Sequence, residues 1–147
     1  MSRGRTLENE LSPSCQRALD HLNERRPEAE LVAVEGDWAY VSVGHIDVSA
    51  VTNVFEEDET LGIIRIPTDF PCNTAPYGLI TVPYLNRLDG QTVGKQDRNH
   101  QKAEAVQGLF DDEVGFWSWR WNNVSSNAEA DLRKAPDMFR ERLRMED

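Results

Sequence analysis

The sequence predicts an α+β domain with an N-terminal helix, a four-stranded antiparallel meander sheet and C-terminal helices. Three observations support this order. A helical apolar period follows Ser12-Pro13, four short β-type segments come next with no helical pattern between them, and a helical period returns after residue 127. Strands joined by short turns pair as antiparallel neighbours. In an α+β layout of this kind we expect the helices to pack on one face and end of the sheet.

The first helix is predicted to begin at Ser12, a good N-cap, with Pro13 at the first helical position. The apolar residues that follow recur at a helical period: Cys15, Ala18, Leu19 and Leu22. A charged run before Pro27 ends the pattern. We therefore expect a short amphipathic helix.

Four segments have the composition of β-strands. Residues 31–34 and 38–43 are separated by Glu35-Gly36-Asp37, whose turn chemistry predicts a hairpin. Residues 61–66 are rich in β-branched side chains and predict a central strand, and residues 79–82 predict a fourth strand. In this order the four segments form the predicted meander.

The C-terminal third is less regular. Residues 91–99 are polar and predict a loop, and residues 101–110 predict a short helix. Residues 127–145 have a helical period that Pro136 interrupts, because proline lacks the N–H of a helix interior. The last helix is therefore expected over residues 137–144.

Length and charge restrict the classes of function. A chain of 147 residues suits one domain, expected here at 12–147 behind a flexible N-terminus at 1–11. Its net charge of −10 argues against nucleic-acid binding, since phosphate contacts need clustered cations. No apolar run approaches a membrane span, and the N-terminus has no apolar signal region. We expect a cytoplasmic protein that binds no membrane. Its acidic, lysine-poor composition fits either a salt-adapted host or an arginine-rich, GC-rich genome.

Cysteine and histidine usage predicts neither a metal site nor a cofactor. The two cysteines are too few for a disulfide framework or for a zinc site of their own. His21, His45 and His100 are dispersed and lack the spacing of metal ligands.

The stretch from residue 63 to residue 93 is the most distinctive part of the chain. Two apolar strands flank a turn that begins at Phe70-Pro71, and prolines stand at positions 67, 71, 76 and 83. Each proline fixes its own φ angle and restricts the residue before it. So many restrictions indicate a shaped connection beside a site.

The order of elements, with Phe70-Pro71 directly after the third strand, resembles the ubiquitin-conjugating enzyme superfamily, which includes non-catalytic variants and RWD domains. The segments LVAVEGDWAYVSV, LGIIRIPTDFP and GFWSWRWNN look most like its divergent prokaryotic branch. The resemblance covers roughly residues 14–145. It implies the superfamily's fold and a role beside a ubiquitin-like protein and an adenylating activating enzyme.

The resemblance also implies where a catalytic site would lie. In the superfamily a cysteine takes the C-terminus of the modifier as a thioester, and the asparagine of a His-Pro-Asn motif stabilises the oxyanion. Tyr84-Leu85-Asn86 matches that motif at Asn86 alone, and Gly90 matches the glycine that precedes the nucleophile. Val93 stands where the cysteine is expected, and a valine cannot form a thioester.

Two catalytic candidates remain, each with a plainer alternative. Cys72, beside the Phe-Pro turn, is either a displaced nucleophile or a small buried apolar residue, and free cysteines are more often the latter. Asn86 is either an oxyanion donor or a loop residue that bonds its own backbone.

Candidate partner-binding residues come from two places, the proline-rich turn and the aromatic segment. The turn contributes Phe70, Pro71 and Pro76, and the aromatic segment contributes Trp117 and Trp119. Together with Trp121 these tryptophans alternate at a period of two, which places them on one face of an extended segment. They form either a core wall, which is favoured, or an exposed anchor patch.

The resemblance implies two alternative functions. The first is a divergent ubiquitin-conjugating-enzyme-like component of a prokaryotic ubiquitin-like modification system, which acts with an activating enzyme and lacks the cysteine at the usual position. It would either carry the modifier as a thioester on Cys72 or position it without a covalent bond. The second is a non-catalytic module that holds a ubiquitin-like protein or another protein partner.

Overall fold

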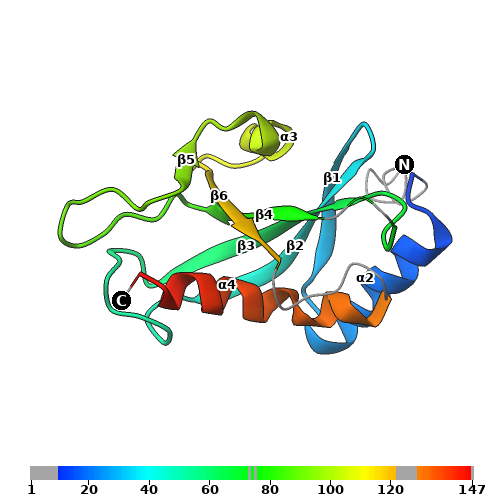
Figure 1. The fold of residues 1–147 in the computed structure, drawn as a ribbon, viewed down its shortest axis with the longest axis horizontal. Coiled ribbons are helices and arrows are strands. Elements are labelled where there is room, and N and C mark those ends of the chain that lie inside the picture. The colour runs from blue at the N-terminus through cyan, green and yellow to red at the C-terminus, as the bar shows by residue number, and fades with distance from the viewer. Residues whose placement is uncertain (1–9, 73, 75, 122–128, 147) are drawn as a thin grey trace.

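The computed structural model describes residues 10–72, 74, 76–121 and 129–146. Its architecture is α+β (Figure 1), and the strands form one antiparallel sheet in the order β1-β2-β3-β4-β6-β5. The first four strands are the predicted meander. The sheet nevertheless has six strands, and the prediction of four was wrong because two later segments add to the β4 edge.

The N-terminal helix α2 spans Pro13–Arg25. The Ser12 hydroxyl accepts a hydrogen bond from the N–H of Cys15 at 3.1 Å, and Pro13 occupies the first turn, so the predicted cap is confirmed. Within the predicted flexible N-terminus, residues 1–9 lie outside the described residues, and the Leu11 side chain is buried.

The meander consists of β1 (Glu30–Glu35), β2 (Trp38–Asp47), β3 (Glu59–Pro67) and β4 (Tyr77–Val82). In the β1–β2 hairpin Glu35 pairs with Trp38, and Gly36 takes a φ of +59° at the first turn position. Two-residue hairpin turns require positive φ there, and glycine adopts it without a Cβ clash.

The aromatic segment forms β6 (Gly115–Arg120), which pairs with β4, and β5 (Gln96–Arg98) pairs with the outer side of β6. The prediction of a loop over residues 91–99 was therefore wrong for β5. A three-residue edge strand is held by backbone hydrogen bonds, and it needs no apolar alternation to form.

Helices cover both faces of the sheet, rather than the single face that was predicted. The helix α2, the 3-10 helix η2 (Glu129–Lys134) and α4 (Ala135–Arg144) cover one face. On the other face lie the short η1 (Gln101–Ala103) and α3 (Glu104–Gln107). The helix α4 has Pro136 in its first turn, which explains why the helical pattern restarts there.

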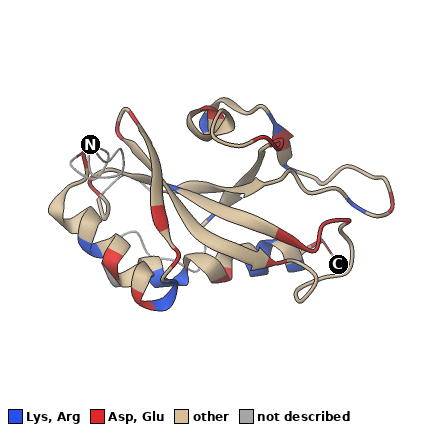
Figure 2. Cartoon of the chain, turned by 180° about the vertical axis from the view of Figure 1, so that it is seen from behind, with Lys and Arg blue, Asp and Glu red and all other residues tan. Residues whose placement is uncertain are grey.

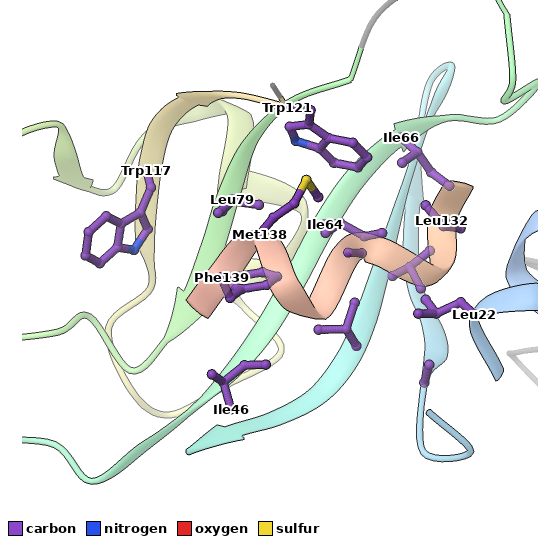
Figure 3. Packing of buried hydrophobic residues seen from close by; sticks show 14 of the residues in the cluster. Leu22, Ile46, Ile64, Ile66, Leu79, Trp117, Trp121, Leu132, Met138 and Phe139 are labelled. Atoms are coloured by element: carbon purple, nitrogen blue, oxygen red, sulfur yellow. The ribbon is translucent and has the colours of Figure 1, made fainter. Parts of the chain in front are cut away.

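The main core lies between the sheet and the helices α2 and α4 (Figure 3). Trp117, Trp119 and Trp121 all belong to it, with exposed fractions of 1%, 9% and 8%. The tryptophans therefore form the core wall that the sequence favoured. Each large side chain of this kind contributes roughly 1.5–3 kcal/mol by leaving water.

Candidate functional site

A pocket of about 280 Å³ lies beyond the C-terminal end of β4. Its lining comes from residues 84–87 and 90–93 of the loop that follows β4, together with Glu56 and Arg98. The three positions that the resemblance assigned to a catalytic site, Asn86, Gly90 and Val93, all line it. The three residues that the resemblance assigned to one site are therefore neighbours in space.

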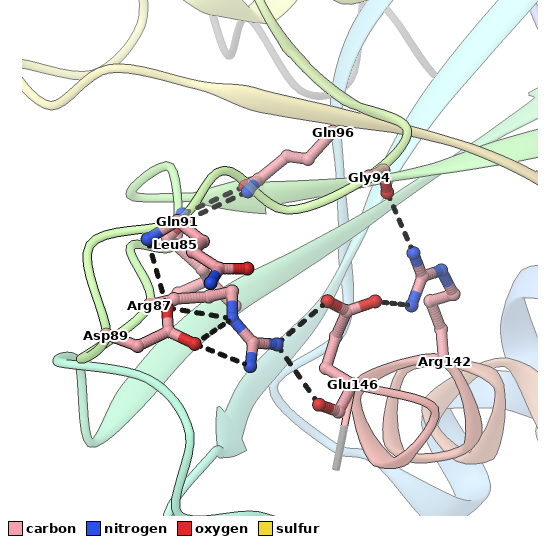
Figure 4. Close-up of polar contacts among 8 residues, drawn as sticks. All are labelled: Leu85, Arg87, Asp89, Gln91, Gly94, Gln96, Arg142 and Glu146. Atoms are coloured by element: carbon pink, nitrogen blue, oxygen red, sulfur yellow. Dashed lines mark hydrogen bonds and ion pairs between the residues drawn. The ribbon is translucent and has the colours of Figure 1, made fainter.

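Gln96 holds the first part of this loop from inside (Figure 4). Its side chain is buried, donates from Nε2 to the Leu85 carbonyl at 2.9 Å and accepts at Oε1 from the Leu85 N–H at 2.9 Å. The Thr81 hydroxyl donates to the same Oε1 at 3.4 Å and accepts from Trp117 Nε1 at 2.8 Å. One amide group therefore supplies Leu85 with the backbone pairing that a neighbouring strand would otherwise provide.

The C-terminal end of α4 and the residues just after it hold the rest of the loop through a chain of ion pairs (Figure 4). Arg87 Nη1 lies 3.2 Å from Glu146 Oε1, and Arg142 Nη1 lies 2.8 Å from Glu146 Oε2. Arg142 Nη2 also donates to the Gly94 carbonyl at 3.0 Å. The Arg142 and Glu146 side chains are only 7% and 15% exposed, so these charges are less screened than surface pairs.

Arg87 is also bound on its other side by Asp89. That hydrogen bond raises the pKa of Arg87 and lowers the pKa of the Asp89 carboxyl. Arg87 therefore stays charged and occupied, and it closes one wall of the pocket.

Asn86 is engaged with Glu57. Its backbone N–H and its side-chain Nδ2 each donate to the Glu57 carboxylate at 2.9 Å, and Nδ2 also lies 3.4 Å from the Tyr84 carbonyl. The side-chain donors needed to stabilise an oxyanion are thus directed at protein acceptors. This arrangement matches the structural alternative for Asn86, in which the residue fixes the loop.

Arg98 is the accessible cation of the pocket. Its guanidinium carbon lies 4.0 Å from the centre of the Tyr84 ring, and its Nε lies 2.7 Å from Glu113 Oε2. Its side chain is 50% exposed. The pocket can therefore offer an aromatic surface and a positioned positive charge to a ligand.

Val93 closes the pocket with an apolar side chain that is 3% exposed and part of the main core. Gly90 has a φ of +79°, and a Cβ at this position would meet open space. The lining contains no cysteine, so no thioester can form there.

Cys72 lies before the other end of β4, directly after Phe70-Pro71 in the connection that joins β3 to β4. Six strand residues separate the two ends, which corresponds to roughly 20 Å. Partial burial raises the pKa of the Cys72 thiol, and a hydrogen bond with Asp69 raises it further. These surroundings favour the neutral thiol, whereas catalytic cysteines are found beside cations.

Cys15 is fully buried on α2, and its thiol lies 3.6 Å from the Pro67 carbonyl. Burial raises its pKa to about 11. This cysteine is a core residue.

The predicted partner-binding residues are distributed between core and surface. Phe70 is fully buried, Trp117 and Trp119 belong to the core, Pro76 is buried, and Pro71 is half-buried. The turn and the tryptophans thus do not form one exposed patch, and the roles predicted for these residues stay predictions.

Sequence reasoning missed three side chains that build the pocket: Gln96, Arg142 and Glu57. Gln96 stands in a polar stretch with no pattern, and nothing local indicates its buried amide. The spacing of Arg142 and Glu146 at i and i+4 is a signal that was available.

The described residues also bear on metal binding and on membrane insertion. Within residues 10–72, 74, 76–121 and 129–146, no group of three or more His, Cys, Asp or Glu side chains could hold a metal ion. No helix in the same described part of the chain has the length and apolar character to cross a membrane.

Comparisons of the chain with protein-family models, with curated proteins and with solved structures find no match. The resemblance to the ubiquitin-conjugating superfamily therefore rests on the sequence pattern.

Proposed function

We propose that this chain is a ubiquitin-conjugating-enzyme-like component of a prokaryotic ubiquitin-like modification system that holds its partner without a thioester. One observation carries the proposal. The positions that correspond to the superfamily's site, Asn86, Gly90 and Val93, line one built pocket that contains no nucleophile.

The chemistry of the pocket supports binding rather than transfer. A thioester requires a thiolate, and the chain's two cysteines both lie outside the pocket. The Asn86 amide donors already bond to protein acceptors, so they are not arranged for a developing oxyanion. What the pocket offers is shape, the Tyr84 ring and the Arg98 guanidinium.

The proposed ligand is the C-terminal tail of a ubiquitin-like protein, presented by its activating enzyme. An extended tail is narrow enough for a pocket of about 280 Å³, and its backbone carbonyls and terminal carboxylate can pair with a cation. Genes for a ubiquitin-like protein, an adenylating enzyme and an isopeptidase are expected beside this one.

The test combines a gel with a binding measurement. The protein is incubated with the neighbouring activating enzyme, the ubiquitin-like protein and ATP, and separated on a non-reducing gel. We expect complex formation without a reductant-sensitive adduct. An adduct that disappears in Cys72→Ser would instead show that Cys72 carries the modifier.

Two matched variants locate the binding site. Thr92 is exposed on the pocket wall, and Thr74 is exposed near Cys72 at the opposite end of β4. Thr92→Trp should fill the pocket and weaken binding at least tenfold, whereas Thr74→Trp should leave it unchanged. The reverse pattern would place the partner at the Phe-Pro turn and contradict the proposal.

A further inference from the structure

A second and larger hollow, of about 600 Å³, lies between β6 and the last turn of α4. Its walls come from residues 118–120 of β6, from Tyr77 of β4, from Gly94 and Lys95 before β5, and from Arg142, Met145 and Glu146. We call it the β6 groove. It is separate from the pocket described above, because no residue lines both.

Among the residues that the structure describes, β5 covers only part of the outer edge of β6. The pairing of β5 with β6 ends at Trp117, and one further hydrogen bond joins the Ser118 N–H to the Lys95 carbonyl at 2.9 Å. Beyond that point, no strand among the described residues pairs with the outer side of Trp119 and Arg120. An uncovered strand edge is a template for a further strand.

The charge of the β6 groove is opposite to that of the molecule. The chain has a net charge of −10, and Figure 2 shows acidic residues over the helices and loops. The groove nevertheless collects Lys95, Arg120 and Arg142 against a single carboxylate, that of Glu146. Arg142 and Arg87 already neutralise that carboxylate.

Lys95 and Arg120 are exposed, and neither has an ion-pair partner in the part of the chain that the structure describes. Lys95 directly precedes β5, and Arg120 is the last residue of β6, so both lie where the pairing of these two strands has ended. Met145, which is 61% exposed, and Trp119 supply apolar surface to the same groove.

We propose that the β6 groove binds an extended acidic segment of a partner protein, which lies along the uncovered edge of β6 with its carboxylates on Lys95 and Arg120. Backbone hydrogen bonds to the strand edge supply the extended conformation, and the two cations select acidic side chains. This site does not depend on the function of the pocket near Asn86.

The probe is a fluorescein-labelled ten-residue peptide of alternating glutamate and valine, compared with the same peptide carrying glutamine for glutamate. Binding is measured by fluorescence anisotropy at 0.15 M salt. We expect the glutamate peptide to bind at least fivefold more tightly than the glutamine peptide. Successive residues of an added strand direct their N–H groups alternately toward β6 and away from it. N-methylation of one alternate set of peptide residues should therefore abolish binding, whereas N-methylation of the other set should spare it.

The variants are charge reversals of equal size. Lys95→Glu and Arg120→Glu should each weaken the glutamate peptide about fivefold, as expected for losing one exposed ion pair and adding a repulsion. The control is Lys134→Glu on η2, an exposed lysine outside the groove that pairs with Asp131. Circular dichroism checks that all three variants fold.

Three outcomes would overturn the proposal. One is equal affinity for the glutamate and glutamine peptides. Another is the same loss of affinity in Lys134→Glu as in the two groove variants. The third is self-association in analytical ultracentrifugation that Arg120→Glu abolishes, which would show that a second copy of the chain occupies the edge.

Discussion

Replacing Gln96 by leucine should loosen the pocket, because one buried amide pairs both backbone groups of Leu85. Leucine has a similar size but no polar atoms, so Leu85 would keep an N–H and a carbonyl without their partners. The two lost hydrogen bonds cost about 2 kcal/mol together, and leaving the two buried backbone groups unpaired adds roughly 1 kcal/mol. We expect a total loss of about 3 kcal/mol.

Urea denaturation measures the loss directly, since the change in midpoint at constant slope gives the change in free energy of unfolding. For a chain of this length, about 3 kcal/mol corresponds to a fall in Tm of roughly 6–12 °C. Amide hydrogen exchange at Leu85 separates local opening of the loop from global unfolding, because opening confined to the loop exposes this N–H first.

The matched control is Gln91→Leu, a substitution of the same type on the exposed part of the same loop. It should change the free energy of unfolding by less than about 0.5 kcal/mol. A loss below about 1 kcal/mol in Gln96→Leu, with unchanged exchange at Leu85, would refute the reasoning. The loop would then be held by its ion pairs alone.

Two further predictions concern charge and reactivity. A hydrogen bond from Arg25 lowers the pKa of the Asp137 carboxyl, with the two side chains paired at 2.7 Å between α2 and α4. The pair therefore stabilises the fold above the ordinary pKa of aspartate and loses this contribution as pH falls through the lowered value. Asp137→Asn should cost under about 1 kcal/mol at pH 7, because both groups are substantially exposed, and nothing near pH 2, as urea titrations at each pH will show. Second, iodoacetamide should label Cys72 alone in the folded protein, more slowly at pH 7 than it labels a free thiol, because the pKa of Cys72 is raised and Cys15 is buried. Mass spectrometry identifies the labelled residue, and rapid labelling at pH 7 would contradict the raised pKa.

The first four strands could be predicted because their side chains alternate or are β-branched between recognisable turns. The strand β6 was visible only as an aromatic alternation, and β5 was not visible at all. Gln96-Asp97-Arg98 is polar, and its pairing with β6 depends on backbone groups that every residue carries. Edge strands of this length therefore escape sequence patterns.

The pocket was predicted in part, for a physical reason. Asn86, Gly90 and Val93 lie within one loop, so their spacing in the sequence limits their distance in space. Cys72 was a candidate because the same stretch contains it, but a whole strand lies between it and Asn86. Nearness in sequence across a strand places two residues at opposite ends of the sheet.

The side chains that shape the pocket support a binding role more directly than those that line it. The buried Gln96 amide and the little-exposed charges of Arg142 and Glu146 lose hydration on folding, so their net contribution to stability is small. Removing one partner is nevertheless costly, because the other is left buried and unpaired. Here they act on the Leu85 and Gly94 backbone and on Arg87, which lie along one loop. Such contacts fix a loop conformation that apolar packing would leave less defined. A loop held in one shape around a pocket without a nucleophile is compatible with the proposed binding role. If that proposal holds, Gln96→Leu will weaken binding of the proposed ubiquitin-like partner as well as the fold.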